Sequence, residues 1–335
     1  MRRGAQGEKP MQAIVYRRYG PPEVLELSEI DKPAPAPGEV LVRIHAASVN
    51  PYDWHFMRGT PKFIRLFTGL RGPKSPRLGA DMAGVVESVG DGVALFNAGD
   101  AVIGCGKGSF AEYACVAESK LAIKPESLSF EQAAAVPIAG ITALQGLRNC
   151  GRTQSGQRVL INGAAGGVGT FAVQIGKWLG AHVTGVCSTR NVALVQSLGS
   201  DRVIDYTRED FTRSGDRWDV IFDLVGNHPL AALRRALEPQ GVLVGCGGGG
   251  PEKTSADLLK GMLRQAVTAP FVSQKLTGVL AKINGGDLKL LAGLLEKGTI
   301  RSVLDRSYGL NSVAEAIGYV ETGHTRGKVT VTVRN

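Results

Sequence analysis

The sequence lacks the cysteine pattern of a disulfide framework or a zinc ribbon. Its 335 residues include five cysteines, an odd number, and no two of them form a C-x-x-C pair. The five lie far apart along the chain, at Cys105, Cys115, Cys150, Cys187 and Cys246. This usage is typical of a reducing compartment, and we expect the cytoplasm.

Long apolar runs and aromatic residues are also scarce. The longest apolar run, residues 133–147, is interrupted by Pro137 and Gly140 and is shorter than the roughly 20 residues of a membrane span. Aromatic residues make up 6% of the chain, and the basic residues behind its net charge of +9 are scattered. We therefore expect neither a membrane nor a nucleic acid as partner. Residues 1–10 have no apolar core and are expected to form a loose tail, not a secretory signal.

Glycine, in contrast, is abundant, with 45 residues. The predicted secondary structure differs between the first part of the chain and the rest. Up to residue 122, short alternating segments between turn residues predict β strands at 39–46, 84–89, 101–103 and 112–116. Beyond residue 130, strands predicted at 158–162, 182–187, 219–223 and 241–245 alternate with helices at 167–179 and 192–198. This β-α-β-α order predicts an α/β fold with a doubly wound parallel sheet.

Two capping boxes help to place helices. Ser129 with Gln132 predicts the start of a helix over 133–147, and Ser312 with Glu315 predicts a helix that ends near residue 321. A final strand is predicted at 328–333. We expect a β-rich domain over residues 11–130, completed by 302–335, and a parallel-sheet domain over 131–301.

The strongest local motif is a glycine loop, Asn162-Gly163-Ala164-Ala165-Gly166-Gly167-Val168-Gly169, between a predicted strand and a predicted helix. It is an A-x-G-x-x-G variant of the dinucleotide fingerprint. Such glycines allow a tight turn, close approach of the pyrophosphate and close packing of helix on strand. We predict that the backbone from Ala165 to Gly169 binds a dinucleotide.

The end of the next predicted strand indicates which dinucleotide binds. A site for NAD usually has Asp or Glu there, whereas this chain has Ser188, Thr189 and Arg190. These side chains suit a 2'-phosphate, so we predict NADPH as cofactor. A solvated arginine is the alternative interpretation. Tyr206 is a second candidate near the adenosine, with core packing as its alternative.

Several stretches resemble the medium-chain dehydrogenase/reductase superfamily, most closely its zinc-free quinone oxidoreductase, or zeta-crystallin-like, branch. The similar stretches are Ser48-Val49-Asn50-Pro51-Tyr52-Asp53, Gly79-Ala80-Asp81-Met82-Ala83-Gly84, Gly99-Asp100-Ala101-Val102, Gly108-Ser109-Phe110-Ala111-Glu112-Tyr113, Ala139-Gly140-Ile141-Thr142-Ala143 and Gly323-His324-Thr325-Arg326-Gly327-Lys328. The resemblance implies a GroES-like β-barrel domain plus a Rossmann domain, with cofactor and substrate between them.

Zinc enzymes of this superfamily hold a catalytic metal with Cys, a His-Glu pair and a second Cys or His. The resemblance places Asn50, Ala80, Asp81 and Ile138 at those positions, and Asp81 alone cannot hold zinc. We therefore predict no metal. Without a Lewis acid, reduction of a polarised acceptor is favoured over oxidation of an alcohol.

The sequence thus predicts hydride transfer from NADPH to a quinone or an α,β-unsaturated carbonyl. We place Asn50, Tyr52, Asp53 and His55 at the reaction site, on a loop after the strand 39–46. The resemblance implies that Asn50 positions ribose or substrate. His55 could donate a proton or only form structural hydrogen bonds, and Asp53 could order the loop.

Other predicted site residues come from later in the chain. The stretch 245–250, with Gly245, follows a strand at its carboxyl end, the usual ligand edge. Arg326 and Lys328 could contact cofactor phosphate or solvent. Phe271 and residues 266–276 could line the substrate pocket or form an oligomer contact.

Two other functions stay open. One is an NADPH-binding adaptor or crystallin-like protein without turnover. The other is an enoyl thioester reductase, for which residues 60–77 lack a tyrosine proton donor but hold basic residues that could meet an anionic carrier. Because relatives are commonly dimers or tetramers, we expect a homo-oligomer.

Overall fold

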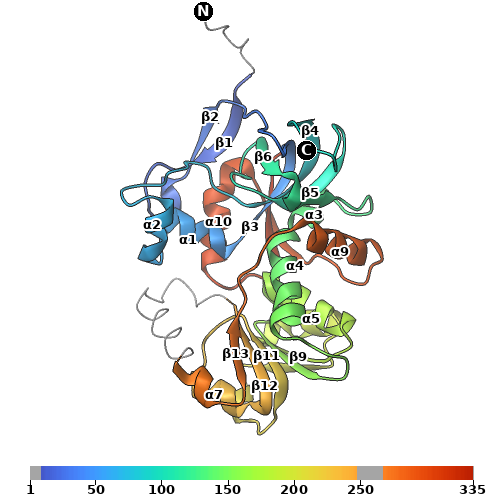
Figure 1. Cartoon of the computed structure of the whole chain (residues 1–335). Helices are drawn as coiled ribbons and strands as arrows, with labels where there is room; N and C mark the ends of the chain where they lie inside the picture. The colour runs from blue at the N-terminus through green and yellow to red at the C-terminus, as the bar shows by residue number, and fades with distance from the viewer. Residues whose placement is uncertain (1–8, 247–266, 335) are drawn as a thin grey trace, which may run out of the picture.

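The structure, a computed structural model, describes residues 9–246 and 267–334. Within these residues, six parallel strands form one sheet, in the order β10-β9-β8-β11-β12-β13 (Figure 1). The strands are β8 (Arg158–Asn162), β9 (His182–Cys187), β10 (Arg202–Asp205), β11 (Trp218–Asp223), β12 (Leu237–Gly245) and β13 (Lys275–Gly278). This order reverses between β8 and β11, which is the doubly wound topology, and ligands bind such sheets at the reversal.

The second, largely antiparallel sheet of the described chain belongs to the β-rich domain and has the strand order β14-β15-β3-β4-β5-β7, with β6 also paired to β3. A separate pair, β1 with β2, lies at its edge (Figure 1). The bounds are β1 (Met11–Val15), β2 (Glu26–Ile30), β3 (Glu39–Val49), β4 (Asp81–Val89), β5 (Ala101–Cys105), β6 (Tyr113–Ala117), β7 (Leu121–Ile123), β14 (Leu304–Gly309) and β15 (Lys328–Thr332).

The helices lie mostly in the second half of the chain. They are α1 (Pro51–Arg58), α2 (Arg65–Thr68), α3 (Phe130–Ala134), α4 (Pro137–Leu144), α5 (Gly167–Trp178), α6 (Val192–Ser197), α7 (Leu230–Arg235), α9 (Gly285–Glu296) and α10 (Val313–Glu321). The core beneath α4 and α5 contains Ile161, Phe171 and Phe222, all fully buried. Burying each such side chain stabilises the fold by roughly 1.5–3 kcal/mol.

The predicted fold class, a GroES-like β-barrel plus a Rossmann sheet, is confirmed. The domain boundaries at residues 130 and 301 stay predictions, although the strands of the two sheets fall on either side of them. The tail at 1–8, residues 247–250 of the predicted ligand stretch, and Ala266 lie outside the described residues.

Three local predictions were wrong. The single helix over 133–147 is two helices, α3 and α4, followed by a π-helical segment, Gln145–Cys150. Pro137 begins α4 because its ring suits the first turn of a helix but not the interior. The Ser129 capping box does form, with Ser129 Oγ accepting from the Gln132 backbone N–H at 3.2 Å. Ser312 forms no such bond, because a 3-10 turn, Leu310–Ser312, precedes α10.

The third wrong prediction concerns the loop that was expected to carry the reaction site. Asn50 is the N-cap of helix α1, and Tyr52, Asp53 and His55 lie within that helix. Pro51 occupies its first turn, and Asp53 Oδ2 accepts from the Asn50 backbone N–H at 2.8 Å. These residues are therefore held by regular structure at the end of the longest barrel strand, β3.

Candidate active site

The glycine loop lies between β8 and α5, at the reversal of the parallel sheet. A Cβ atom on Gly169 would lie 2.1 Å from the carbonyl oxygen of Gly163, so only glycine fits where α5 crosses the loop. A Cβ atom on Gly166 would meet nothing nearer than 3.5 Å. Gly166 is therefore free of steric crowding, as the fingerprint requires where a pyrophosphate approaches the backbone.

The first turn of α5 has unused hydrogen-bond donors. Its N-cap, Gly166, has no side chain, and no side-chain cap satisfies the N–H groups of Gly167, Val168 and Gly169. A helix N-terminus with open donors favours an anion. The loop from Ala165 to Gly169 thus fits the pyrophosphate of a dinucleotide.

The C-terminal segment of the barrel domain returns to this same loop. Gly327 donates its N–H to the Ala165 carbonyl at 2.8 Å and forms a parallel bridge with Gly166. Gly327 has φ +93°, and a Cβ there would lie 2.3 Å from the Val303 carbonyl oxygen. Glycine is thus required where the two domains touch beside the dinucleotide loop.

Lys328, the next residue, connects the glycine loop to Asn50. Its Cδ lies 2.9 Å from the position that a Cβ on Gly167 would take. Its ammonium donates to Asn50 Oδ1 at 2.5 Å and to the Val49 carbonyl at 3.0 Å. Lys328 is 3% exposed, so it is not solvated, and its contact with cofactor phosphate stays a prediction.

Asp81 completes a buried polar cluster around Asn50. Its Oδ2 accepts from Asn50 Nδ2 at 2.9 Å and from Ser48 Oγ at 3.0 Å, while its Oδ1 accepts from the Ile138 N–H at 3.0 Å. The Lys328 ammonium lies 3.7 Å from Asp81 Oδ2. Because lysine only donates and a carboxylate only accepts, these partners fix the orientation of the Asn50 amide.

This cluster occupies the positions at which the resemblance places zinc ligands, and it does not fit zinc. The Asp81 carboxylate already accepts three hydrogen bonds beside an ammonium, and that ammonium would repel a metal cation. Across residues 9–246 and 267–334, no group of three or more His, Cys, Asp or Glu is placed to hold a metal ion.

Complete burial shifts the pKa values of this cluster. Burial raises the pKa of Asp53 to about 8; the Asn50 N–H opposes the rise, and the charge of Asp81 adds to it. Burial also raises the pKa of Asp81 and lowers that of Lys328, and each opposes the shift of the other. At neutral pH, Asp53 is therefore largely protonated, and Lys328 has a single carboxylate partner, Asp81.

His55 and Tyr52 lie on α1 beside this cluster. His55 Nδ1 lies 2.8 Å from the Thr60 carbonyl, so this nitrogen bears the proton in the neutral ring. Burial lowers the pKa of His55, and the ring stacks on Trp54 with centroids 3.6 Å apart. Burial raises the pKa of Tyr52 well above its usual value.

The predicted adenosine site contains a carboxylate that the sequence reasoning missed. Asp205, at the end of β10, accepts from Thr189 Oγ1 at 2.6 Å, and this bond lowers the pKa of Asp205. Arg190 donates to the His324 carbonyl at 2.9 Å and so reaches across to the C-terminal segment. Tyr206 is 56% exposed, so it is not a core residue. The pattern of an NAD site predicts an acidic residue at the end of the second strand, whereas Asp205 ends the third, β10.

The other predicted residues lie at both edges of the parallel sheet and on the C-terminal segment. Gly245 ends β12 and pairs with Gly278 of β13. Arg326 is exposed, and its backbone N–H donates to Asp305 Oδ2 at 2.8 Å. Phe271 is 84% exposed and precedes β13, at the opposite edge of the sheet from Gly245. A second missed interaction joins the ends of β8 and β11, where Asn162 Nδ2 donates to Asp223 Oδ1 at 2.9 Å.

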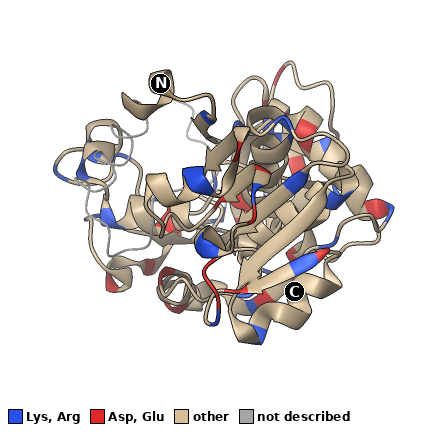
Figure 2. Ribbon diagram, turned by 90° about the horizontal axis from the view of Figure 1, so that it is seen from below, with Lys and Arg blue, Asp and Glu red and all other residues tan. Residues whose placement is uncertain are grey.

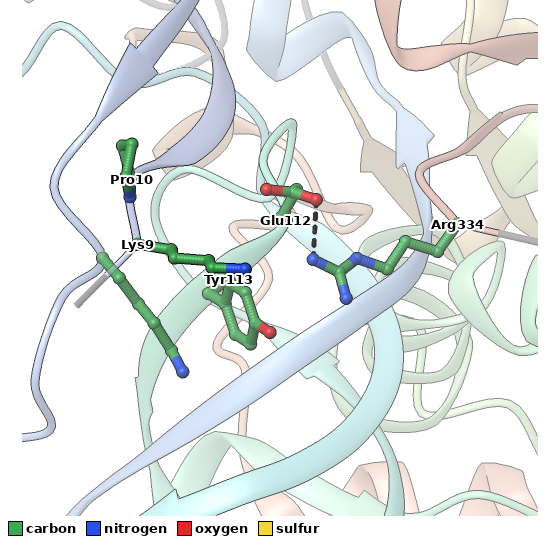
Figure 3. Close-up of a pocket in the computed structure, with 6 residues that line it drawn as sticks. Lys9, Pro10, Glu112, Tyr113 and Arg334 are labelled. Carbon is green, nitrogen blue, oxygen red and sulfur yellow. Dashed lines mark hydrogen bonds and ion pairs between the residues drawn. The ribbon is translucent and has the colours of Figure 1, made fainter.

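A separate cavity of about 460 Å³ lies at the outer edge of the barrel, on β6 and the chain end. It is lined by Lys9, Pro10, Lys32, Glu112, Tyr113 and Arg334 (Figure 3). Arg334 donates to Glu112 at 2.6 Å, so these two charges are paired. Basic and acidic residues are interspersed over most of the described chain (Figure 2), whereas residues 54–80 hold six basic residues and no Asp or Glu.

Comparison with known proteins places the chain in a family. Residues 36–126 match the alcohol dehydrogenase GroES-like domain, and residues 198–331 match a zinc-binding dehydrogenase domain. A chloroplast envelope quinone oxidoreductase homolog from Arabidopsis thaliana is 33% identical, over 96% of this chain and 98% of its own length. The chain therefore belongs to the quinone oxidoreductase-like branch of the medium-chain dehydrogenase/reductase superfamily.

Two further relatives agree with this assignment. An NADPH-dependent alkenal/one oxidoreductase from Arabidopsis thaliana is 34% identical, over 96% of this chain and 80% of its own length. The structure of the quinone oxidoreductase from Coxiella burnetii superposes with a TM-score of 0.85 at 32% identity, covering 97% of this chain and 100% of that one. As a member of this branch, the protein is an oxidoreductase, which confirms the predicted class. None of the helices described is long and apolar enough to cross a membrane.

Proposed function

We propose that this medium-chain reductase uses NADPH, without zinc, to reduce a quinone or an α,β-unsaturated carbonyl. The observation that carries the proposal is the cluster of Asn50, Asp81 and Lys328, which occupies the metal positions and adjoins the dinucleotide loop. When bound, NADPH supplies the hydride. Two of the relatives described above are named for a quinone and for an alkenal or alkenone.

Different residues of this chain would bind different parts of the cofactor and the substrate. The open N–H groups of Gly167, Val168 and Gly169 would bind the pyrophosphate. Ser188 and Arg190 would hold the 2'-phosphate. Asn50 has both amide hydrogens engaged, by Asp81 and by the Ser48 carbonyl, so it can only accept from a ribose or substrate hydroxyl.

Cofactor and acceptor are tested in one titration. Purified protein is titrated separately with NADPH and NADH while nicotinamide fluorescence is followed, and 9,10-phenanthrenequinone or an enone is then added. We expect tighter binding of NADPH and its oxidation by at least one acceptor. Tight binding without oxidation by either class would instead support the adaptor. A preference for NADH would contradict the phosphate site.

The predicted role of Arg190 can be tested against a matched control variant. Arg190→Met removes a charged donor to phosphate, and we expect NADPH binding to weaken about tenfold to a hundredfold with NADH binding unchanged. Arg202→Met serves as control, because Arg202 pairs with Asp216 at 2.7 Å at the opposite end of β10. We also propose a homo-oligomer, which light scattering on the same samples tests.

A further inference from the structure

The segment after α1 exposes an apolar stripe to solvent. Phe63, Leu66, Phe67 and Leu70 are 44%, 65%, 77% and 70% exposed. Phe63 lies on the 3-10 turn Lys62–Ile64, Leu66 and Phe67 lie on α2, and Leu70 follows Gly69, which ends α2. This segment lies at the margin of the barrel domain (Figure 1). We call these four residues the exposed stripe.

Contacts to the body of the domain hold the stripe in this orientation. Tyr19 Oη lies 2.7 Å from Thr68 Oγ1 and donates to the Gly69 carbonyl at 2.7 Å. Arg65 lies over the Tyr19 ring at 4.6 Å and donates to the Gly59 carbonyl at 3.0 Å. Thr68 and Arg65 are thus turned toward the domain, which leaves Leu66 and Phe67 outside.

The surroundings of the stripe carry charge of one sign. Residues 54–80 contain six basic residues and no Asp or Glu. Of these, Arg71 and Lys74 are exposed near the stripe, whereas Arg58 is paired with Glu321. Large exposed apolar side chains followed by exposed cations are the composition of a segment that lies in the interface of an anionic membrane.

We propose that the exposed stripe docks the protein on an anionic lipid surface. Leu66 and Phe67 would enter the boundary between headgroups and acyl chains, and Arg71 and Lys74 would bind lipid phosphates. Such docking differs from spanning and needs no long apolar helix. It does not depend on which acceptor the enzyme reduces.

Vesicle sedimentation with the full chain tests the proposal. We expect binding to phosphatidylcholine vesicles that contain phosphatidylserine, weaker binding in high salt, and none to phosphatidylcholine alone. Arg71→Gln with Lys74→Gln should weaken binding about thirtyfold, at about 1 kcal/mol per cation. Leu66→Ser with Phe67→Ser should weaken it by at least tenfold.

Matched variants exclude a general surface effect. Leu95→Ser changes a residue that is 67% exposed between β4 and β5, and it should leave vesicle binding unchanged. Lys289→Gln with Lys297→Gln should likewise have little effect, because both lysines lie on or just after α9, away from the stripe. All variants should bind NADPH as the unmodified chain does, which shows that each is folded.

Three results would overturn the proposal. Equal binding to both vesicle types, or binding that persists in both the Leu66→Ser/Phe67→Ser and the Arg71→Gln/Lys74→Gln variants, would place the lipid contact elsewhere. A fall in oligomer mass for Leu66→Ser with Phe67→Ser, without vesicle binding by the unmodified chain, would assign the stripe to a second copy. A raised KM for the acceptor with no vesicle binding would assign it to the substrate path.

Discussion

Lys328 donates a hydrogen bond to Asn50 across 278 positions of sequence. Its Cδ lies 2.9 Å from the position that a Cβ on Gly167 would take, and its ammonium orients the amide beside Asp81. The glycine loop and the polar cluster around Asn50 therefore share one side chain. A substitution of Lys328 should therefore alter both the glycine loop and the orientation of the Asn50 amide.

Removing the Lys328 charge should destabilise the protein. Lys328→Met leaves Asp81 buried without a cation, and we expect the free energy of unfolding to fall by about 3–5 kcal/mol in denaturant titrations. Combining it with Asp81→Asn removes both charges and should recover most of that loss. A loss below about 1 kcal/mol in the single variant would show that the ion pair is not what stabilises the cluster.

Two single glycine-to-alanine substitutions in the loop should distinguish an effect on cofactor binding from an effect on stability. Gly166→Ala has room in the free protein, so we expect unchanged thermal stability but weaker NADPH binding. Gly169→Ala places a methyl 2.1 Å from the Gly163 carbonyl oxygen, so it should lower stability as well. Melting curves with and without NADPH distinguish the two. Equal melting temperatures for both variants would contradict the geometry.

Asp53 should make stability fall as pH rises. Its folded pKa of about 8 lies above its ordinary value of 3.8, so between those pH values the folded state holds a proton that the unfolded state has lost. The slope from this group is about −1.4 kcal/mol per pH unit, absent below pH 4 and above pH 8. Asp53→Asn should remove that contribution, and denaturant titrations at several pH values measure it. A slope unchanged by the substitution would show that Asp53 is ionised in the folded protein.

His55 should prove structural. Its Nδ1 is engaged by Thr60, and its lowered pKa keeps the ring neutral at pH 7, so Nε2 has no proton to give. We expect His55→Asn to change kcat less than tenfold, whereas loss of a general acid costs about 10²- to 10⁴-fold. Stopped-flow oxidation of NADPH by the acceptor measures this. A larger loss, rescued by imidazole, would restore the proton-donor hypothesis.

Local patterns predicted the parallel sheet and the dinucleotide loop because their signals lie within a few residues. The strand His182–Cys187 has its predicted bounds, and Gly166 and Gly169 have the steric surroundings that the fingerprint requires. Helix α1 was missed although a signal existed: Asn50, Pro51 and Asp53 occupy the cap, first and third positions. Such a pattern predicts a helix start.

The polar cluster could not be predicted in this way. Asn50, Asp81 and Lys328 come from three separate segments, and only the register of β15 on β3 and of β3 on β4 brings them together. Asp205 was missed for a related reason, since its contact with Thr189 depends on the pairing of β10 with β9. Contacts between strands carry no local sequence signal.

The place of β15 also sets an order for folding. Strand β3 has β4 on one side and β6 and β15 on the other. Lys328 of β15, whose ammonium donates to the Val49 carbonyl, follows Val49 by 279 residues. During synthesis, the six-stranded parallel sheet is complete before the barrel can close. Until β15 is synthesised, residues 46–49 of β3 lack their antiparallel partner, whereas residues 39–43 of the same edge pair with β6. An open strand edge is a template for aggregation, so the barrel domain is exposed to self-association until β15 has left the ribosome.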